Sequence, residues 1–130
     1  MRNAECGIND MRNENLKNRT KKFALEIIRL VETLSWSRTT DIICKQLIRS
    51  GTSVGANYRA ACRAKSPADF ISKMGTVEEE IDETMYWMEL LTESGALKLN
   101  TIESLMKEAN ELLAITVSSI KTARESRSRK

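Results

Sequence analysis

Basic residues in the middle of the chain carry the clearest chemical signal. Lys45, Arg49, Arg59 and Arg63 fall within roughly 40° of one line when successive residues are turned by about 100°, as in a helix. Lys65 follows them. We expect no acidic residue in this row, so it could contact the phosphates of a nucleic acid. The alternatives are a solvated surface and a surface paired with acids of a neighbouring subunit.

A second basic group closes the chain, in the segment TARESRSRK and the residue before it. Its members are Lys121, Arg124, Arg127, Arg129 and Lys130. Because no apolar residue follows Ala123, we expect this tail to fray and to add a flexible second contact.

Acidic residues gather in VEEEIDE at residues 77–83. Di-iron bundles need Glu-x-x-His motifs, and this chain contains no histidine. The carboxylates of Glu79, Glu80, Asp82 and Glu83 also spread over more than one side of a helix. The sequence therefore predicts no metal and no cofactor. We expect the segment to complement the basic stretches, within one subunit or between subunits.

Nucleophilic catalysis has little support, because Ser–His and Cys–His activation both require histidine. We therefore do not expect an enzyme. Cys6, Cys44 and Cys62 lack C-x-x-C spacing, and the last two lie roughly 27 Å apart along one predicted helix. They cannot form a disulfide within it. Buried thiols are expected, and a catalytic cysteine without histidine is the remote alternative.

Length and composition predict one domain over residues 1–130, with frayed ends at about 1–12 and 125–130. No apolar run approaches the roughly 20 residues that span a bilayer, and the first residues lack a signal-peptide pattern. We therefore expect a cytoplasmic protein without membrane contact. Residues 41–65 hold five basic residues against one acidic, whereas residues 66–100 hold two against eight.

Hydrophobic periodicity predicts four helices, at about 13–34, 40–64, 67–94 and 100–123. Ser66 and Pro67 fit the start of the third helix, and Gly95 fits its end. Asn100, with Glu103 three residues later, is expected to cap the fourth. Long helices joined by short loops predict an all-α fold, an antiparallel up-down-up-down four-helix bundle.

Two glycines interrupt the second predicted helix, although each costs up to about 1 kcal/mol relative to alanine. Gly51 and Gly55 lie on its apolar side, so we expect them to allow close approach of a neighbouring helix; a kink is the alternative. A neighbouring polar strip is expected to bond an adjacent helix, with ligand binding as the alternative: Gln46, Ser50, Ser53 and Asn57.

The third predicted helix carries large apolar side chains outside its inner stripe, which is more apolar surface than one bundle buries. Tyr86, Trp87 and Leu90 are therefore expected at a subunit interface, with wider packing inside the bundle as the alternative.

Several motifs together resemble one bacterial family. They are SVGANYR at 53–59, RAKS at 63–66, DFISKM at 69–74 and EIDETMYW at 80–87. The chain resembles the 23S rRNA intervening-sequence proteins, relatives of the accessory variability protein of diversity-generating retroelements. This resemblance implies a four-helix bundle that assembles as a homo-oligomer, typically a pentamer. For the retroelement relative it implies binding to nucleic acid and a reverse transcriptase.

One position departs from the family pattern, which often has an acidic residue where Ala60 stands. No acid role there is carried over. We expect a non-enzymatic oligomeric module that binds RNA, DNA or a ribosomal component. The alternative is a protein-interaction scaffold or an accessory subunit, for example of a reverse transcriptase, whose charges serve assembly only.

Overall fold

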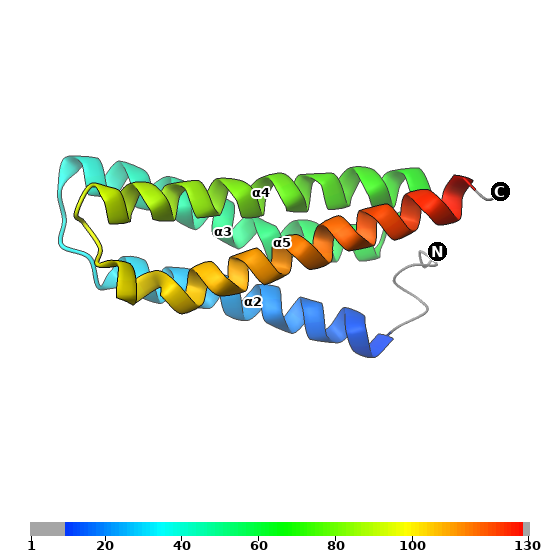
Figure 1. Ribbon diagram of the computed structural model, residues 1–130, viewed down its shortest axis with the longest axis horizontal. Helices are drawn as coiled ribbons and strands as arrows, with labels where there is room; N and C mark the ends of the chain where they lie inside the picture. The colour runs from blue at the N-terminus through cyan, green and yellow to red at the C-terminus, as the bar shows by residue number, and fades with distance from the viewer. Residues whose placement is uncertain (1–9, 129–130) are drawn as a thin grey trace.

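The computed structural model describes residues 10–128, with side chains from residue 15 onward, and contains four helices in that range (Figure 1). They are α2 (Asp10–Glu32), α3 (Arg38–Cys62), α4 (Pro67–Glu93) and α5 (Leu99–Ser128). Short connections force each helix to reverse direction and pack beside the one before it. The predicted all-α antiparallel bundle is confirmed, with no strand among the described residues.

The start and end of α4 follow the predicted cap residues. The side chain of Ser66 accepts a hydrogen bond from the backbone N–H of Asp69, and Pro67 occupies the first turn, where a missing N–H costs nothing. Gly95 has a φ of +86°, a conformation that favours glycine, so the chain turns there toward α5.

Three helix starts differ from the prediction, and the first is α2, which begins at Asp10 instead of near residue 13. α3 begins at Arg38 instead of Thr40, because the Ser37 hydroxyl caps the N–H of Thr40. The predicted cap at Asn100 is wrong: α5 begins at Leu99, and the carbonyl of Lys98 accepts from the N–H of Thr101, so Asn100 lies inside the first turn.

The C-terminal tail is helical to Ser128, beyond the predicted end near Ala123. Arginine has a good helix propensity. The positive charge of Arg127 in the last turn also stabilises the negative end of the helix dipole. Of the ends expected to fray, residues 10–12 and 125–128 are therefore in helices, whereas residues 1–9 and 129–130 lie outside the described range.

Close packing between α2 and α3 depends on the two glycines. A Cβ atom at Gly51 would collide with Cδ1 of Ile27, and one at Gly55 would lie 3.1 Å from Oγ1 of Thr20. Both glycines are buried, and α3 runs as one unbroken helix through them. The glycine positions therefore serve close approach of α2 and not a break in α3.

The core runs along the whole bundle between the four helices. Its fully buried large side chains include Phe23, Leu47, Ile81, Met88 and Ile102. The thiols of Cys44 and Cys62 are buried, and burial raises the pKa of Cys44 above its ordinary value. The described cysteines therefore pack as small apolar residues.

Helices α2 and α5 form the least closely packed seam of the bundle. Arg19 of α2 bridges it, donating to Glu108 at 2.6 Å and 3.0 Å and to Glu111 at 3.3 Å. These bonds raise the pKa of Arg19, first through Glu108. No local sequence pattern indicated this pairing, because Arg19 and Glu108 are 89 residues apart along the chain.

Candidate nucleic-acid interface

The first half of the basic row on α3 is paired with acids of the same chain. Nζ of Lys45 lies 3.0 Å from a carboxylate oxygen of Asp41, one turn earlier. The expectation that no acid shares the row was therefore wrong, since Asp41 has the same angular position as Arg59. Arg49 reaches across to α4, where it bonds Glu80 at 3.1 Å and also Glu83.

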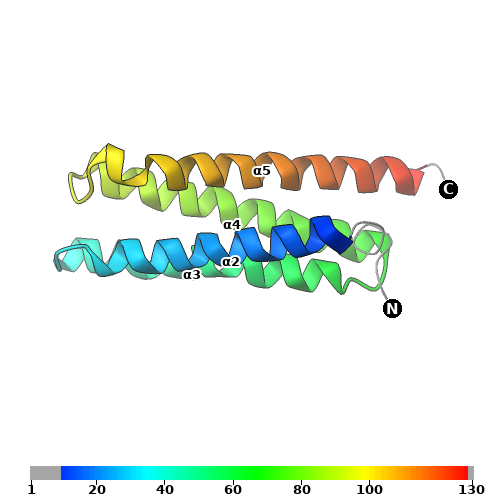
Figure 2. The ribbon, with the colours of Figure 1, turned by 90° about the horizontal axis from the view of Figure 1, so that it is seen from below.

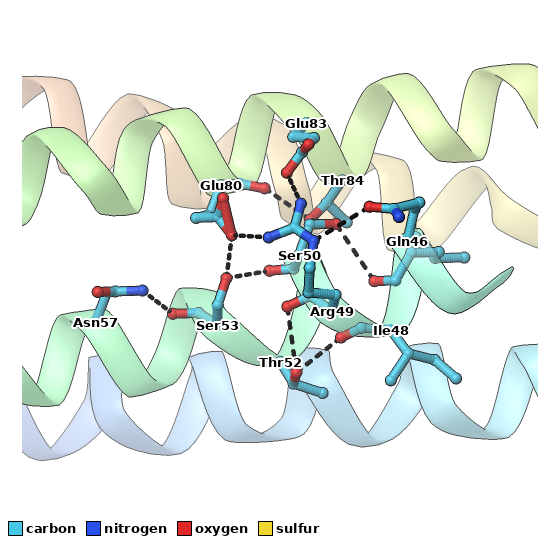
Figure 3. A network of polar contacts seen from close by, with 11 residues as sticks. Gln46, Ile48, Arg49, Ser50, Thr52, Ser53, Asn57, Glu80, Glu83 and Thr84 are labelled. Atoms are coloured by element: carbon cyan, nitrogen blue, oxygen red, sulfur yellow. Dashed lines mark hydrogen bonds and ion pairs between the residues drawn. The ribbon is translucent and has the colours of Figure 1, made fainter. Parts of the chain in front are cut away.

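Arg49 is part of a polar network between α3 and α4 (Figure 3). The hydroxyl of Ser53 donates to Glu80, whose side chain is only 16% exposed. Deeper between the two helices, Oγ1 of Thr84 lies 2.9 Å from Oγ of Ser50, and both residues are fully buried. The network thus gives the Glu80 carboxylate two donors and satisfies the buried hydroxyls.

The four residues of the polar strip on α3 have hydrogen-bond partners on two different helices. Ser50 and Ser53 bond α4, as predicted. Gln46 and Asn57 instead bond within α3: Gln46 accepts from Arg49 at 3.2 Å, and Asn57 donates to the carbonyl of Ser53 at 2.8 Å (Figure 3). Half of the strip therefore connects α3 to α4, and the other half bonds within α3.

The ion pairs of Arg49 with Glu80 and Glu83 favour its charged form. Its hydrogen bond to Glu83 is the main cause that raises its pKa, and the charge of Glu80 adds to this. Two of the predicted acidic residues thus pair with the basic row inside one chain. The other two, Glu79 and Asp82, are exposed.

The second half of the basic row faces solvent. Arg59 and Arg63 are exposed, and neither forms an ion pair with a described residue. The side chain of Lys65 is exposed too, while its backbone N–H donates to Asp69 at 3.1 Å. Asp69 also accepts from Lys73 at 2.5 Å, and this bond, the largest cause, lowers the pKa of Asp69.

The basic residues of α5 that the structure describes are also exposed. Lys121, Arg124 and Arg127 form no ion pair with any residue in the described range, whereas Arg129 and Lys130 lie outside it. A hollow of about 300 Å³ opens between α4 and α5, with Lys121 and Arg124 at its wall. Its other lining residues are Glu78, Val117, Ile120 and Glu125.

These exposed cations share one end of the bundle. α3 and α5 run in the same direction, so their C-terminal turns lie at the same end of the bundle, which is also the end where α2 starts (Figure 1, Figure 2). We call this the terminal end, formed by residues 15–21, 55–78 and 108–128, and the opposite one the loop end, formed by residues 26–46 and 84–107. The terminal end holds ten Lys and Arg against five Asp and Glu; the loop end holds five against six.

The predicted subunit interface divides between solvent and core. Tyr86 is 52% exposed, whereas Trp87 and Leu90 are half-buried, and Trp87 packs against the core. The rings of Tyr86 and Trp87 meet edge to face with centroids 5.1 Å apart. The buried Nε1–H of Trp87 has no hydrogen-bond partner in the described part of the chain. The interface itself stays a prediction.

The described residues form neither a metal site nor a membrane-spanning helix. No group of three or more His, Cys, Asp and Glu residues in residues 10–128 is placed to hold a metal ion. Within the same range, no helix combines the length and apolar character needed to cross a bilayer.

Comparisons with known proteins place this geometry in a family. Residues 12–118 match the family described as 23S rRNA-intervening sequence protein. A crystal structure from Bacteroides thetaiotaomicron, described as a protein with unknown function from the S23 ribosomal protein family, is 37% identical. The alignment covers 81% of this chain and 97% of that one, with a TM-score of 0.75. A search of curated proteins finds no match. The chain belongs to the 23S rRNA-intervening sequence protein family.

Proposed function

We propose that this chain is a non-enzymatic, homo-oligomeric helical module that binds nucleic acid, RNA or an RNA–protein complex, through the terminal end of its bundle. One observation carries the proposal: exposed arginines without a described ion pair gather there from two helices. They are Arg59 and Arg63 of α3 and Arg124 and Arg127 of α5. Lys65 and Lys121 add to the same surface, whereas Arg129 and Lys130, which follow in the sequence, lie outside the described residues.

Cations without an ion-pair partner suit a phosphate backbone for a simple physical reason. A cation that replaces a condensed counterion on the nucleic acid releases it, and this release drives binding. An arginine already held by carboxylates must break those bonds first. Lys45 and Arg49 therefore contribute less to the proposed interface than Arg59 and Arg63, although sequence periodicity places all four in one row.

Assembly would multiply the effect of each terminal end. Repeating a weak basic surface in every subunit raises the overall affinity for one long polyanion. Tyr86, exposed beside the half-buried Trp87, offers apolar surface for such an assembly. The number of subunits, five, rests on the family resemblance alone.

The second candidate is a scaffold or accessory subunit, for example of a reverse transcriptase, whose charges serve assembly only. The pairing of Arg49 with Glu80 and Glu83 favours it, because basic and acidic residues of this chain engage each other there. In that case Arg59 and Arg63 would meet acids of a partner protein.

Fluorescence polarisation with labelled RNA and DNA, over roughly 50 to 200 mM salt, separates the two candidates. The proposed function predicts binding at low salt that weakens steeply as salt rises, with little sequence preference. No binding to either nucleic acid at the lowest salt would favour the scaffold.

Light scattering tests assembly independently. We expect an oligomer at micromolar concentration, and Tyr86→Ala should reduce its mass while circular dichroism stays helical. Tyr86 is the better position for this test than Trp87, because Trp87 also packs against the core. A wild-type monomer would contradict the oligomeric part of the proposal.

A further inference from the structure

Resting on the proposed function, we infer that the terminal end binds double-stranded nucleic acid in preference to a single strand. The ligand class is a duplex phosphate backbone, of RNA or DNA, contacted from outside by arginine and lysine. Three properties of the terminal end lead to this ligand: its described residues include no exposed aromatic ring, it holds its cations on rigid helices, and it concentrates positive charge.

Aromatic side chains are the first observation. Proteins that bind single strands stack the bases on exposed aromatic rings. This chain has six aromatic residues, and those at the terminal end, Phe23 of the adjoining turn, Tyr58 and Phe70, are buried. The exposed rings of Trp36 and Tyr86 belong to the loop end. Bases of a bound single strand would therefore find no exposed aromatic ring to stack on beside the basic residues.

Rigidity is the second observation. The helical turns that carry the arginines are anchored in the core on their other side. On α3 the anchors are Ala61 and Cys62, between Arg59 and Arg63, and on α5 they are Ile120 and Ala123, beside Lys121 and Arg124. These anchors are 9% exposed or less. The helix backbone from which the cations extend is thus fixed before binding.

Cations on a fixed backbone favour a rigid ligand. A flexible strand loses conformational freedom when several of its phosphates are held at set positions, and this loss weakens binding. A duplex already keeps its phosphates at set positions, so it loses less.

Charge density is the third observation. A duplex carries about twice the charge of a single strand per unit length, and each phosphate contact releases more counterion from it: the slope of log affinity against log salt is about −0.9 per contact for duplex DNA and about −0.7 for single strands. The terminal end, with ten basic and five acidic residues, is matched to the denser polyanion.

The test compares four labelled probes with the full chain: an RNA duplex, a DNA duplex of the same length, an unstructured oligouridine strand and an oligothymidine strand. We expect duplexes to bind about tenfold more tightly than single strands of equal nucleotide length, with a steeper salt dependence. The two duplex arms show whether RNA or DNA is the preferred source of the backbone.

Variants locate the binding to the terminal end. Arg59→Gln combined with Arg124→Gln should weaken duplex binding at least about tenfold. The matched control is Arg29→Gln combined with Arg38→Gln, which removes two exposed arginines from the loop end. Its affinity for the duplex should stay within about twofold of the wild-type affinity. Equal weakening in both variants would overturn the assignment to the terminal end.

The possible failures are distinct. Binding to no probe at low salt would overturn the proposed function itself. Binding to single strands as tightly as to duplexes, with quenching of the fluorescence of Trp36 or Trp87 by stacked bases, would overturn the duplex preference and leave nucleic-acid binding standing.

Discussion

In the first half of α3, Lys45 and Arg49 are held by carboxylates of the same chain, whereas in the second half Arg59 and Arg63 extend into solvent. Both halves carry two cationic residues four positions apart on the same side of the helix. The difference comes from the surroundings, because α4 presents Glu80 and Glu83 to Arg49, while Arg59 pairs with no carboxylate among the described residues. A basic row on one helix therefore shows which charges exist and not which are available for a ligand.

The largest expected effect that tests this comparison is on nucleic-acid binding. Replacing both Arg59 and Arg63 by Gln should weaken binding at least about tenfold, and the salt slope should fall by about one for each phosphate that the variant no longer contacts. Arg49→Gln should change affinity by less than about twofold at the same salt. Fluorescence polarisation measures both, and equal weakening in the two variants would show that the halves are equivalent.

A change at the middle of α3 should affect both halves together. Gly51→Leu drives a side chain into Ile27 of α2 and should destabilise the fold by about 2 kcal/mol, as overpacking does. Gly75→Ala on α4 is the control: no atom lies within 4 Å of its Cβ position, so it should stabilise by about 0.5–1 kcal/mol. Urea unfolding measures both, and a stable Gly51→Leu would show that α2 can move away.

Replacing one arginine in each half should change the free energy of unfolding by different amounts. Arg49→Gln leaves the poorly exposed Glu80 without its cation, so we expect a decrease in stability of about 0.5–1 kcal/mol, discounted for the exposure of Arg49. Arg59→Gln should cost close to nothing. Urea unfolding and a double-mutant cycle with Glu83→Gln measure the coupling, and additive effects would mean that the ion pair contributes no stability.

The smallest expected effect is the pH dependence of Asp69, beside the second half of α3. Lys73 and the backbone N–H of Lys65 lower its pKa below about 3.9, the ordinary value of an aspartate carboxyl. Their stabilisation is therefore fully present above that pH and disappears as the pH falls through the lowered pKa. The Tm of wild type should exceed that of Asp69→Asn near neutral pH, and the gap should close in acid. A constant gap would contradict this.

Much of the fold followed from local patterns in the sequence. Apolar residues at helical spacing predicted four helices in their correct order, and Ser66, Pro67 and Gly95 marked the ends of α4. The cap at Asn100 and the end near Ala123 were wrong, because a backbone carbonyl at Lys98 and good helix formers in the tail decided those ends. Helix ends depend on a few weak interactions, so local patterns predict them less well.

By itself, the sequence determined that the chain forms amphipathic helices which must bury their apolar stripes against one another, since most helical stability in proteins comes from the packing of an amphipathic face. It also determined which residues are charged. Only the tertiary structure decided which of these charges are neutralised. Arg19 meets Glu108 and Arg49 meets Glu80 and Glu83 across helix boundaries, because packing fixes the register of neighbouring helices. The same packing brings the C-terminal turns of α3 and α5 to one end, where their arginines remain exposed.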